Sequence, residues 1–269
     1  MDLPGLMIFW TVWCSTAIIL CDAASRRIEG YSLLSVVTAS GTAVSIFVAT
    51  GIGSGLFLDG TAQWLGKLWI YPYWTPGMYG ACFVVGFCAY WLLLAETYFL
   101  ARSVLRPLFP RRAVCAAPGG KRFAGLLGFG LGASGLVLAI RDYAGAGGYQ
   151  FRLTAPASAH SSFRSFLALL AGAWLMLEFL TGRRQSLSLL QTVRQRNFLP
   201  LCAILTAGWI FGFLMETANA AAHFWRYTNW PFPEAGICGV PVMVLLLWPA
   251  QYVIFLSLFC VLSGSPVWE

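Results

Sequence analysis

The sequence predicts an all-α, polytopic membrane protein of about seven transmembrane helices in a 3+1+3 parallel internal repeat. In this plan one further helix joins two like-oriented three-helix units. Of the 269 residues, 59% are hydrophobic and only 10% are charged, whereas an ordinary soluble domain has about 25% charged residues. So few charges do not cover a water-exposed surface, which indicates that the chain lies in a lipid bilayer. In hydrocarbon the backbone polar groups must be hydrogen-bonded within helices or a closed barrel. The apolar runs are long and unbroken, which favours helices over the short alternating strands of a barrel.

Seven apolar runs reach or approach the length of about 20 residues that a helix needs to cross a bilayer. The first run is too long, and its N-terminal flank too poor in Lys and Arg, for a cleaved signal peptide, so we expect it to remain as a helix. The fourth run is rich in glycine, which leaves open whether it spans the membrane completely. The predicted spans lie near residues 5–22, 42–66, 77–100, 123–140, 163–181, 199–222 and 236–262.

The basic residues predict the orientation. With seven spans, the loops after spans one, three and five share a side with the C-terminus, and twelve of the 17 Lys and Arg residues fall there. Because positive loops stay in the cytoplasm, we expect a multi-pass protein of the cell membrane with its N-terminus outside and its C-terminus in the cytoplasm. This bias accounts for the net charge of +7, and since no binding module is visible we expect no nucleic-acid partner. The twelve are Arg26, Arg27, Arg102, Arg106, Arg111, Arg112, Lys121, Arg122, Arg183, Arg184, Arg194 and Arg196; the other five are Lys67, Arg141, Arg152, Arg164 and Arg226.

The cysteine and histidine residues predict no metal site. The eight Cys residues, Cys115 among them, show no CxxC spacing, so we interpret them as small apolar packing residues and not as zinc ligands or a disulfide framework. His160 and His223 lie far apart and form no HExxH motif. We expect neither a metal nor another cofactor.

The chain is similar to itself at a shift of 156 residues. When residues 22–92 are placed over residues 178–248, many identities coincide, among them the pattern Trp-x-Tyr-x-x-Trp, once in each copy. Shared hydrophobicity alone would not place this pattern twice at one offset, so we interpret it as a repeat. A single linker helix adds one membrane crossing, so both three-helix units point the same way, as in SWEET-type transporters. We expect any site to lie where the two units face each other. The predicted divisions are residues 1–104 for the first unit, 105–160 for a basic cytoplasmic loop, the fourth helix and an outer loop, and 161–269 for the second unit.

Polar side chains within the spans are the candidates for function, because a charge at mid-depth costs at least roughly 2.5–3.5 kcal/mol. Two polar stripes fall on matching helical faces in the two repeats. Asp59 and Glu216 are the candidate catalytic acids, and we expect both to face one shared cavity between the units. The stripes consist of Asp59, Gln63 and Lys67 on span two, and of Glu216, Asn219 and His223 on span six.

Part of this pattern has a simpler explanation. Lys67 and His223 lie close enough to the outer end of their helices to be solvated. The aromatic residues of the repeated pattern are typical of an interfacial belt, which needs no ligand, and this is the favoured interpretation. The alternative is that four of them, Trp69, Tyr71, Trp225 and Tyr227, line a substrate site together with Gln63, Asn219 and His223. The aromatic residues concerned are Trp69, Tyr71 and Trp74 in the first copy, and Trp225, Tyr227 and Trp230 in the second.

Glu96 lies deep in the third span, with no basic residue beside it. Hydrocarbon disfavours a charged carboxylate, so we expect the side chain to be neutral. A neutral carboxylic acid can donate a proton, which makes Glu96 a third candidate catalytic acid or a proton relay. It can equally be a structural group, hydrogen-bonded to a neighbouring helix.

The stretch from Glu216 to Trp248 contains Glu-(x8)-Trp-Arg-Tyr-Thr, then Gly-Val-Pro-Val, then Trp-Pro. It resembles the membrane carotenoid hydratase and lycopene cyclase-like families. The resemblance implies acid-initiated chemistry on a polyene end group, with Glu216 as the acid and with Trp225 and Tyr227 lining the site. The residues after Pro241 are Val-Met-Val, where the cyclase families carry acidic residues, and this departure argues against cyclisation.

Three hypotheses about function remain. The first is a membrane enzyme that hydrates, isomerises or cyclises an apolar prenyl or carotenoid lipid by acid–base chemistry. The second is a small 3+1+3 transporter with a site for a small solute at mid-membrane. The third is a non-catalytic subunit that associates with partner membrane subunits.

Overall fold

The computed structural model describes residues 3–30, 32–65, 67–109, 121–145, 163–184, 186–265 and 267–268, and within them the chain is mostly helical. Arg111, Arg112, Cys115, Arg152 and His160, which entered the sequence analysis, lie outside the described residues. The elements in chain order are α1 (Leu3–Glu29), α2 (Leu33–Val37), α3 (Gly41–Leu58), the π-helical turn η1 (Asp59–Leu65), β1 (Trp69–Ile70), α4 (Pro76–Leu105), the 3-10 turn η2 (Arg106–Leu108), α5 (Lys121–Gly145), α6 (Phe163–Arg183), α7 (Leu189–Arg194), α8 (Leu199–Ala222), β2 (Arg226–Tyr227), β3 (Gly236–Ile237), β4 (Val240–Pro241) and α9 (Val242–Ser263).

Several helices are long and apolar enough to cross a membrane, which identifies a multi-pass membrane protein. α4 has 30 residues and contains the third predicted span. In α5 the apolar part is the shorter stretch Gly125–Leu138. Within the described part of the chain, the five segments that meet both the length and the composition of a span are Met7–Glu29, Gly41–Gln63, Phe163–Arg183, Leu199–Ala220 and Val242–Ser263.

The last helix begins later than predicted. We expected a span from residue 236, but β3 and β4 form an antiparallel hairpin there and α9 starts at Val242. Gly239 in the turn has a φ of 79°, a conformation that glycine adopts without a steric penalty. Pro241 has no amide hydrogen and stands just before the first turn of α9. Apolar composition alone did not reveal this hairpin.

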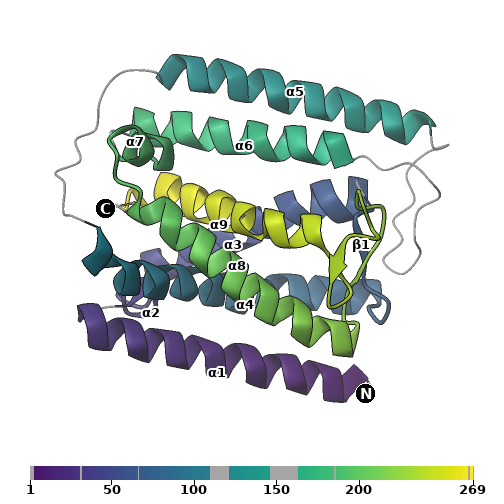
Figure 1. Ribbon diagram of the computed structural model, residues 1–269, viewed down its shortest axis with the longest axis horizontal. Coiled ribbons are helices and arrows are strands. Elements are labelled where there is room, and N and C mark those ends of the chain that lie inside the picture. Colours follow the sequence, from purple (N-terminus) through teal and green to yellow (C-terminus); the bar gives the residue numbers. More distant parts are fainter. Residues whose placement is uncertain are drawn as a thin grey trace.

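The helices lie side by side in one bundle (Figure 1). α5 and α6 run along one edge, α1 runs along the opposite edge, and α3, α4, α8 and α9 lie between them. α1 packs on α4, α6 packs on α9, and α5 packs on α6; the inner helices pack as α3 with α4, α8 with α9, α3 with α9 and α4 with α8. The two termini lie at opposite ends of the bundle, which we call the N-terminal end, where β1 lies, and the C-terminal end, where α2 and α7 lie.

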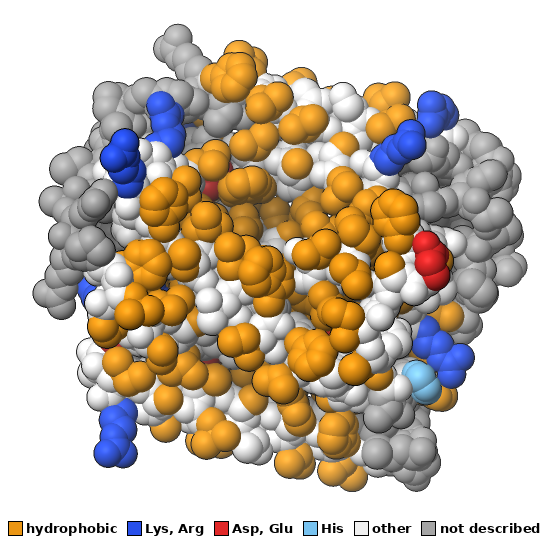
Figure 2. Space-filling model, in the orientation of Figure 1, with side chains coloured by type: hydrophobic (Ala, Val, Ile, Leu, Met, Phe, Trp, Pro, Cys, Tyr) orange, Lys and Arg blue, Asp and Glu red, His pale blue; other side chains and the backbone are white. Residues whose placement is uncertain are grey.

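The outer surface has the character of a lipid-facing one. Figure 2 shows hydrophobic side chains across the middle of one face, with Lys and Arg gathered toward the two ends of the bundle. Side chains on the outer helices are strongly exposed, for example Ile19 at 65%, Phe129 at 69% and Ile210 at 60%. In water such a surface would favour aggregation, whereas hydrocarbon solvates it.

Glycine residues allow α5 to lie directly against α6. A Cβ atom added at Gly128 would lie 2.9 Å from the Leu175 Cβ, and one added at Gly172 would lie 2.5 Å from the Gly132 nitrogen. Real Cβ atoms do not approach so closely, so the two backbones meet where side chains are absent. Small residues at such contacts are typical of packing between membrane helices. The glycine content of the fourth predicted span therefore serves helix packing.

Aromatic packing and a close helix approach position the centre of the bundle. Trp91 of α4 stacks on Phe255 of α9, with ring centroids 5.0 Å apart. A Cβ atom added at Gly212 of α8 would lie 2.5 Å from Cγ of Trp248 in α9. The absence of a side chain at Gly212 therefore lets the Trp248 indole lie flat against α8.

Two short segments, residues 67–74 and 225–230, close the N-terminal end of the bundle, and we call them together the end cap. Strand β1 in the first segment pairs antiparallel with β2 in the second, with Trp69 opposite Tyr227. The indole of Trp230 donates a hydrogen bond of 2.7 Å to the carbonyl of the residue before β1. The end cap therefore joins the segment after α3 and η1 to the segment after α8.

Local geometry recurs at the shift of 156 residues. Lys67, the first residue of one segment of the end cap, and His223, two residues before the other, both have a left-handed backbone, with φ values of 48° and 53°. Ser32 and Ser188 each begin a short helix, α2 and α7, and both form a capping box with the third residue of that helix. These pairs coincide in the sequence comparison as well.

Candidate functional site

A cavity of about 360 Å³ lies between α1, α4, α6, α8 and α9, beneath the end cap. Asp59 and Glu216 both line this cavity, and the two residues are only 2% and 0% exposed. The structure therefore brings together the two acids that the sequence predicted to face a shared cavity. The walls are largely aromatic, and six of the rings belong to the end cap: Trp69, Tyr71, Trp74, Trp225, Tyr227 and Trp230.

Glu216 lies in α8 with one carboxyl oxygen bonded and the other unpaired. Oε1 accepts hydrogen bonds from the Tyr227 phenol and from the Trp248 indole, the latter at 2.9 Å. Oε2 is buried and has no hydrogen-bond partner among the described residues. A buried polar atom without a partner costs about 1–3 kcal/mol. In the described part of the chain, Glu216 therefore has one carboxyl oxygen in use and one without a partner, in a residue that lines the cavity.

Asp59, in contrast, has both carboxyl oxygens occupied. The Tyr71 phenol lies 3.1 Å from Oδ1 and 3.1 Å from Oδ2, and the Tyr79 phenol donates to Oδ2 at 2.7 Å. Asp59 is the first residue of η1, a π-helical turn. Such turns are rare, and they are frequent at functional sites.

The two acids meet equivalent partners although they are not aligned in the repeat. At the shift of 156 residues, Glu216 falls on Gly60, one residue after Asp59. The Trp69 indole donates to the Tyr71 hydroxyl at 3.1 Å, and the Trp225 indole donates to the Tyr227 hydroxyl at 2.9 Å. The wider turn at Asp59 and the longer side chain of Glu216 let each acid reach the tyrosine of its own segment.

The two phenols of the end cap are held in their protonated form. Burial, with the neighbouring carboxyl group acting in the same direction, raises the pKa of Tyr71 and of Tyr227 well above the usual value of a tyrosine. Both phenols therefore serve as hydrogen-bond donors to the acids.

The aromatic residues of the end cap are not an interfacial belt, so the favoured interpretation of the pattern was wrong. Tyr71, Trp74 and Trp230 are each 7% exposed, and they line the cavity. The pairing of β1 with β2 lays these segments over the end of the bundle, which turns their rings inward. The alternative interpretation placed four of these residues on the wall of a substrate site. All four line the cavity: Trp69, Tyr71, Trp225 and Tyr227.

The remaining members of the two polar stripes do not line the cavity, against the prediction. The Asn219 side chain donates to the Trp225 carbonyl at 2.9 Å and accepts from the Trp225 amide at 3.1 Å, so it positions the end cap. Gln63 is fully buried and does not line the cavity. His223 is exposed and ends α8, as expected of a solvated residue. Lys67 is half-buried, and burial lowers the pKa of its amine.

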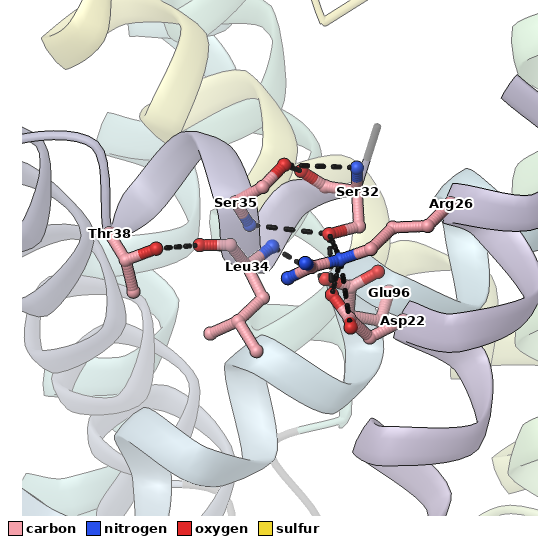
Figure 3. Close-up of polar contacts among 7 residues, drawn as sticks. All are labelled: Asp22, Arg26, Ser32, Leu34, Ser35, Thr38 and Glu96. Atoms are coloured by element: carbon pink, nitrogen blue, oxygen red, sulfur yellow. Dashed lines mark hydrogen bonds and ion pairs between the residues drawn. The ribbon is translucent and has the colours of Figure 1, made fainter. Parts of the chain in front are cut away.

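Glu96 lies outside the cavity, beside α2 at the C-terminal end of the bundle (Figure 3). Its Oε1 accepts a hydrogen bond of 2.6 Å from the Leu34 amide. Asp22 beside it accepts from the Ser32 hydroxyl and forms an ion pair of 3.0 Å with Arg26. The structure therefore does not bring Glu96 together with the other two acids, and its contact matches the alternative of a structural role.

Sequence reasoning missed two partners of the acids, Tyr79 and Trp248. Trp248 belongs to the Trp-Pro pair of the family resemblance, but nothing indicated that its indole would reach Glu216. Tyr79 lies in the first turn of α4 and contacts Asp59 only because α4 packs beside α3. The sequence carries no local signal for either contact.

Three indole groups add polar atoms to the cavity wall. The N–H groups of Trp10, Trp74 and Trp91 are buried and have no acceptor among the described residues. Buried donors are normally paired. Within the described ranges, three residues of the cavity wall thus carry a donor without a partner, and Glu216 carries an acceptor without one.

The described residues contain no group of three or more His, Cys, Asp or Glu side chains that could hold a metal ion. The arrangement offers proton transfer from a carboxyl group in an apolar, aromatic setting. The chain matches no protein-family model, no curated protein and no solved structure.

Proposed function

We propose that this protein is an integral membrane enzyme that protonates a carbon–carbon double bond in the end group of an apolar prenyl or carotenoid lipid. One observation carries the proposal: Glu216 is fully buried on the wall of an aromatic cavity that Asp59 also lines, and one of its carboxyl oxygens has no partner among the described residues. The resemblance of residues 216–248 to membrane carotenoid hydratases and lycopene cyclase-like proteins points to the same chemistry.

The reaction begins with proton transfer from Glu216. The Oε2–H proton adds to the less substituted carbon of a trisubstituted double bond, whose π electrons form the new C–H bond. The other carbon becomes a tertiary cation, and Glu216 becomes a carboxylate. Water then adds to the cation and returns one proton to the carboxylate, so the net change is hydration. Loss of a neighbouring proton to the carboxylate gives isomerisation, and attack by an internal double bond, followed by the same proton loss from the new cation, gives cyclisation.

Asp59 and the aromatic walls stabilise the positive charge in this proposal. Tyr71 and Tyr79 hold the Asp59 carboxyl group in place by hydrogen bonds, on the same cavity as Glu216. Indole and phenol rings attract a cation through their electron-rich faces, and tryptophan does so best. A fixed carboxyl group and fixed rings need little reorganisation when charge develops.

Hydration is the branch that the cavity favours. A buried water needs two to four polar partners, and dry cavities are typically lined by apolar groups alone. The unpaired indole N–H groups of Trp10, Trp74 and Trp91 are donors that a water oxygen can satisfy. The Val-Met-Val sequence after Pro241 agrees with this choice, because it lacks the acidic residues of the cyclase families.

We further propose the 3+1+3 repeat as the architecture that builds this site. Its support is the symmetry of the packing: α1–α4 corresponds to α6–α9, α3–α4 to α8–α9, and α3–α9 to α8–α4. The equivalent Trp–Tyr–acid contacts and the capping boxes of α2 and α7 follow the same correspondence. In this arrangement α1, α3 and α4 form one unit, and α6, α8 and α9 form the other. α5, which contains the fourth predicted span, is the linker helix between them.

The proposed orientation places the end cap outside and the C-terminus in the cytoplasm of the cell membrane. The loops on the C-terminal side carry twelve of the 17 basic residues, and cytoplasmic loops are enriched in Lys and Arg. The cavity then lies in the outer half of the membrane.

The experiment that tests the function is expression in bacteria that accumulate lycopene or a related acyclic carotene, followed by pigment analysis. We expect a hydrated product with the wild-type chain and none with Glu216→Gln. Glu96→Gln is a matched control, because it changes another buried acid, outside the cavity, into an amide that can still accept the Leu34 hydrogen bond. Unchanged pigments with several acyclic substrates would contradict the proposal.

The alternatives predict different results. A small-solute transporter should give solute flux in proteoliposomes that is lost when the cavity is blocked. A non-catalytic subunit should copurify with a stoichiometric membrane partner. Either result, together with unchanged pigments, would replace the enzymatic assignment.

A further inference from the structure

The cavity is closed toward the N-terminal end of the bundle. Above it lies the end cap, in which β1 pairs with β2. Additional hydrogen bonds link its two segments, because Thr228 and Trp230 both donate to the Leu68 carbonyl, at 2.9 and 2.7 Å. A molecule arriving from water at this end would have to break these contacts.

The cavity is open on its side instead. Most of its wall is buried, but Thr11 and Ser15 of α1 and Gly86 and Ala89 of α4 both line the cavity and are exposed at the surface. We call these four residues the side opening. They lie on two helices that pack against each other.

The side opening lies at the depth of the hydrocarbon. Thr11 and Ser15 are four and eight residues into the apolar span that begins at Met7, which corresponds to about 6–12 Å at 1.5 Å per residue. Gly86 and Ala89 are ten and thirteen residues into α4, or about 15–20 Å along its axis. The hydrocarbon core of a bilayer is about 30 Å thick, so lipid tails face this opening.

The residues of the side opening suit the passage of an apolar chain. All four are small and uncharged, so no bulky or charged side chain stands at the opening. The Thr11 hydroxyl donates to the Met7 carbonyl at 2.8 Å within α1, which leaves its methyl group as the surface that a ligand meets.

The volume of the cavity limits how much of a molecule can enter it. A volume of about 360 Å³ lies at the lower end of the range of small-molecule pockets, roughly 300–1,000 Å³. A pocket of this size suits the end group of a prenyl lipid. A long substrate that reaches Glu216 therefore leaves most of its chain outside the cavity.

From these observations we infer that the substrate is a long-chain lipid that enters sideways from the bilayer. Its end group passes between Thr11 and Ser15 on one side and Gly86 and Ala89 on the other, and its tail stays in the membrane. This inference rests on the proposed function for the identity of the end group, but the route itself follows from the closed end and the open side.

Photolabelling in phosphatidylcholine nanodiscs tests the route without measuring turnover. The long probe is a tetraprenyl hydrocarbon with a diazirine on its terminal isoprene unit, and the short probe is the same terminal unit without the tail. Mass spectrometry of peptides reports the labelling of cavity residues. The blocking variant is Ser15→Phe with Ala89→Phe, which narrows the opening.

We expect the long probe to label cavity residues of the wild-type chain and to label them at least tenfold less in the blocking variant. The short probe should lose cavity labelling as well, because its end group has to pass the same opening, and an unfolding temperature in detergent close to that of the wild-type chain shows that the variant is folded. Val12→Phe with Val104→Phe is the control on the same two helices, since these residues are 59% and 57% exposed and do not line the cavity.

Unreduced labelling of the blocking variant by the long probe would overturn the inference, as would the absence of cavity labelling in the wild-type chain. Glu216→Gln should keep the wild-type labelling and lose turnover. If the labelling behaves as expected but no lipid is converted by the wild-type chain, the proposed chemistry fails and the side entry stands.

Discussion

The phenol oxygen of Tyr71 lies 3.1 Å from both carboxyl oxygens of Asp59, so that one hydroxyl group bridges the acid. The same tyrosine accepts from the Trp69 indole. This chain of contacts fixes the Asp59 carboxyl group relative to the end cap, and the equivalent chain of Trp225, Tyr227 and Glu216 does so on α8.

Tyr71→Phe should lower turnover by at least tenfold, because it removes a donor from a buried acid. A hydrogen bond to a charged group contributes about 1.5–3 kcal/mol, roughly a 10- to 150-fold effect. Product formation in membranes, normalised to the amount of folded protein, measures the change. Tyr73→Phe is the matched control, since Tyr73 lies in the same loop, is 44% exposed and does not line the cavity. Wild-type turnover in Tyr71→Phe would show that this contact has no part in the reaction.

Gly212→Ala should destabilise the protein and reduce activity. The added Cβ would lie 2.5 Å from Cγ of Trp248, so the indole that donates to Glu216 must move. Overpacking of this kind costs about 1–3 kcal/mol. Thermal unfolding in detergent and product formation together check both effects. Gly80→Ala in α4 provides the comparison, because a Cβ there meets no atom within 4 Å; equal unfolding temperatures for the two variants would refute the close approach.

Alkaline titration should leave the phenols of Tyr71 and Tyr227 protonated beyond the usual range. Burial raises the pKa of both groups, whereas the unfolded chain loses these protons near pH 10. Above about pH 10 the unfolded state therefore binds fewer protons than the folded state, and stability falls as pH rises. The titration of these two phenols is measured as a difference: the phenolate absorbance of the wild-type chain minus that of the double variant Tyr71→Phe with Tyr227→Phe. A difference signal that titrates near pH 10 in the folded protein would contradict the burial.

Reporter fusions should place the two termini on opposite sides of the membrane. We expect a fluorescent protein fused to the C-terminus to fluoresce and alkaline phosphatase fused there to be inactive, because the basic loops keep that side in the cytoplasm. The reverse pattern is expected at the N-terminus. Active phosphatase at the C-terminus would reverse the proposed orientation.

Much of the helical frame was predictable, because a helix in hydrocarbon must be both long and apolar. That Asp59 and Glu216 line one cavity was predictable too, because they belong to polar stripes at corresponding places in the two similar halves of the sequence. Hydropathy did not separate the β3–β4 hairpin from α9, because its residues are as apolar as those of the helix that follows.

The contacts of the site depended on information that the sequence does not contain locally. An aromatic residue near a helix end fits both an interfacial belt and a cavity wall, and only the pairing of β1 with β2 decides between them. The same holds for Tyr79, which reaches Asp59 from the neighbouring helix α4. Glu96 was chosen for its depth in a span, yet its partner Leu34 comes from a short helix that hydropathy does not reveal.

The π-helical turn at Asp59 makes the two acids poor substitutes for each other. Asp59 lies in a π-helical turn, one residue before the position that corresponds to Glu216, so the longer side chain of Asp59→Glu would extend past the Tyr71 hydroxyl. A change of acid type at either position therefore also requires a change of register, and each change alone disturbs the geometry.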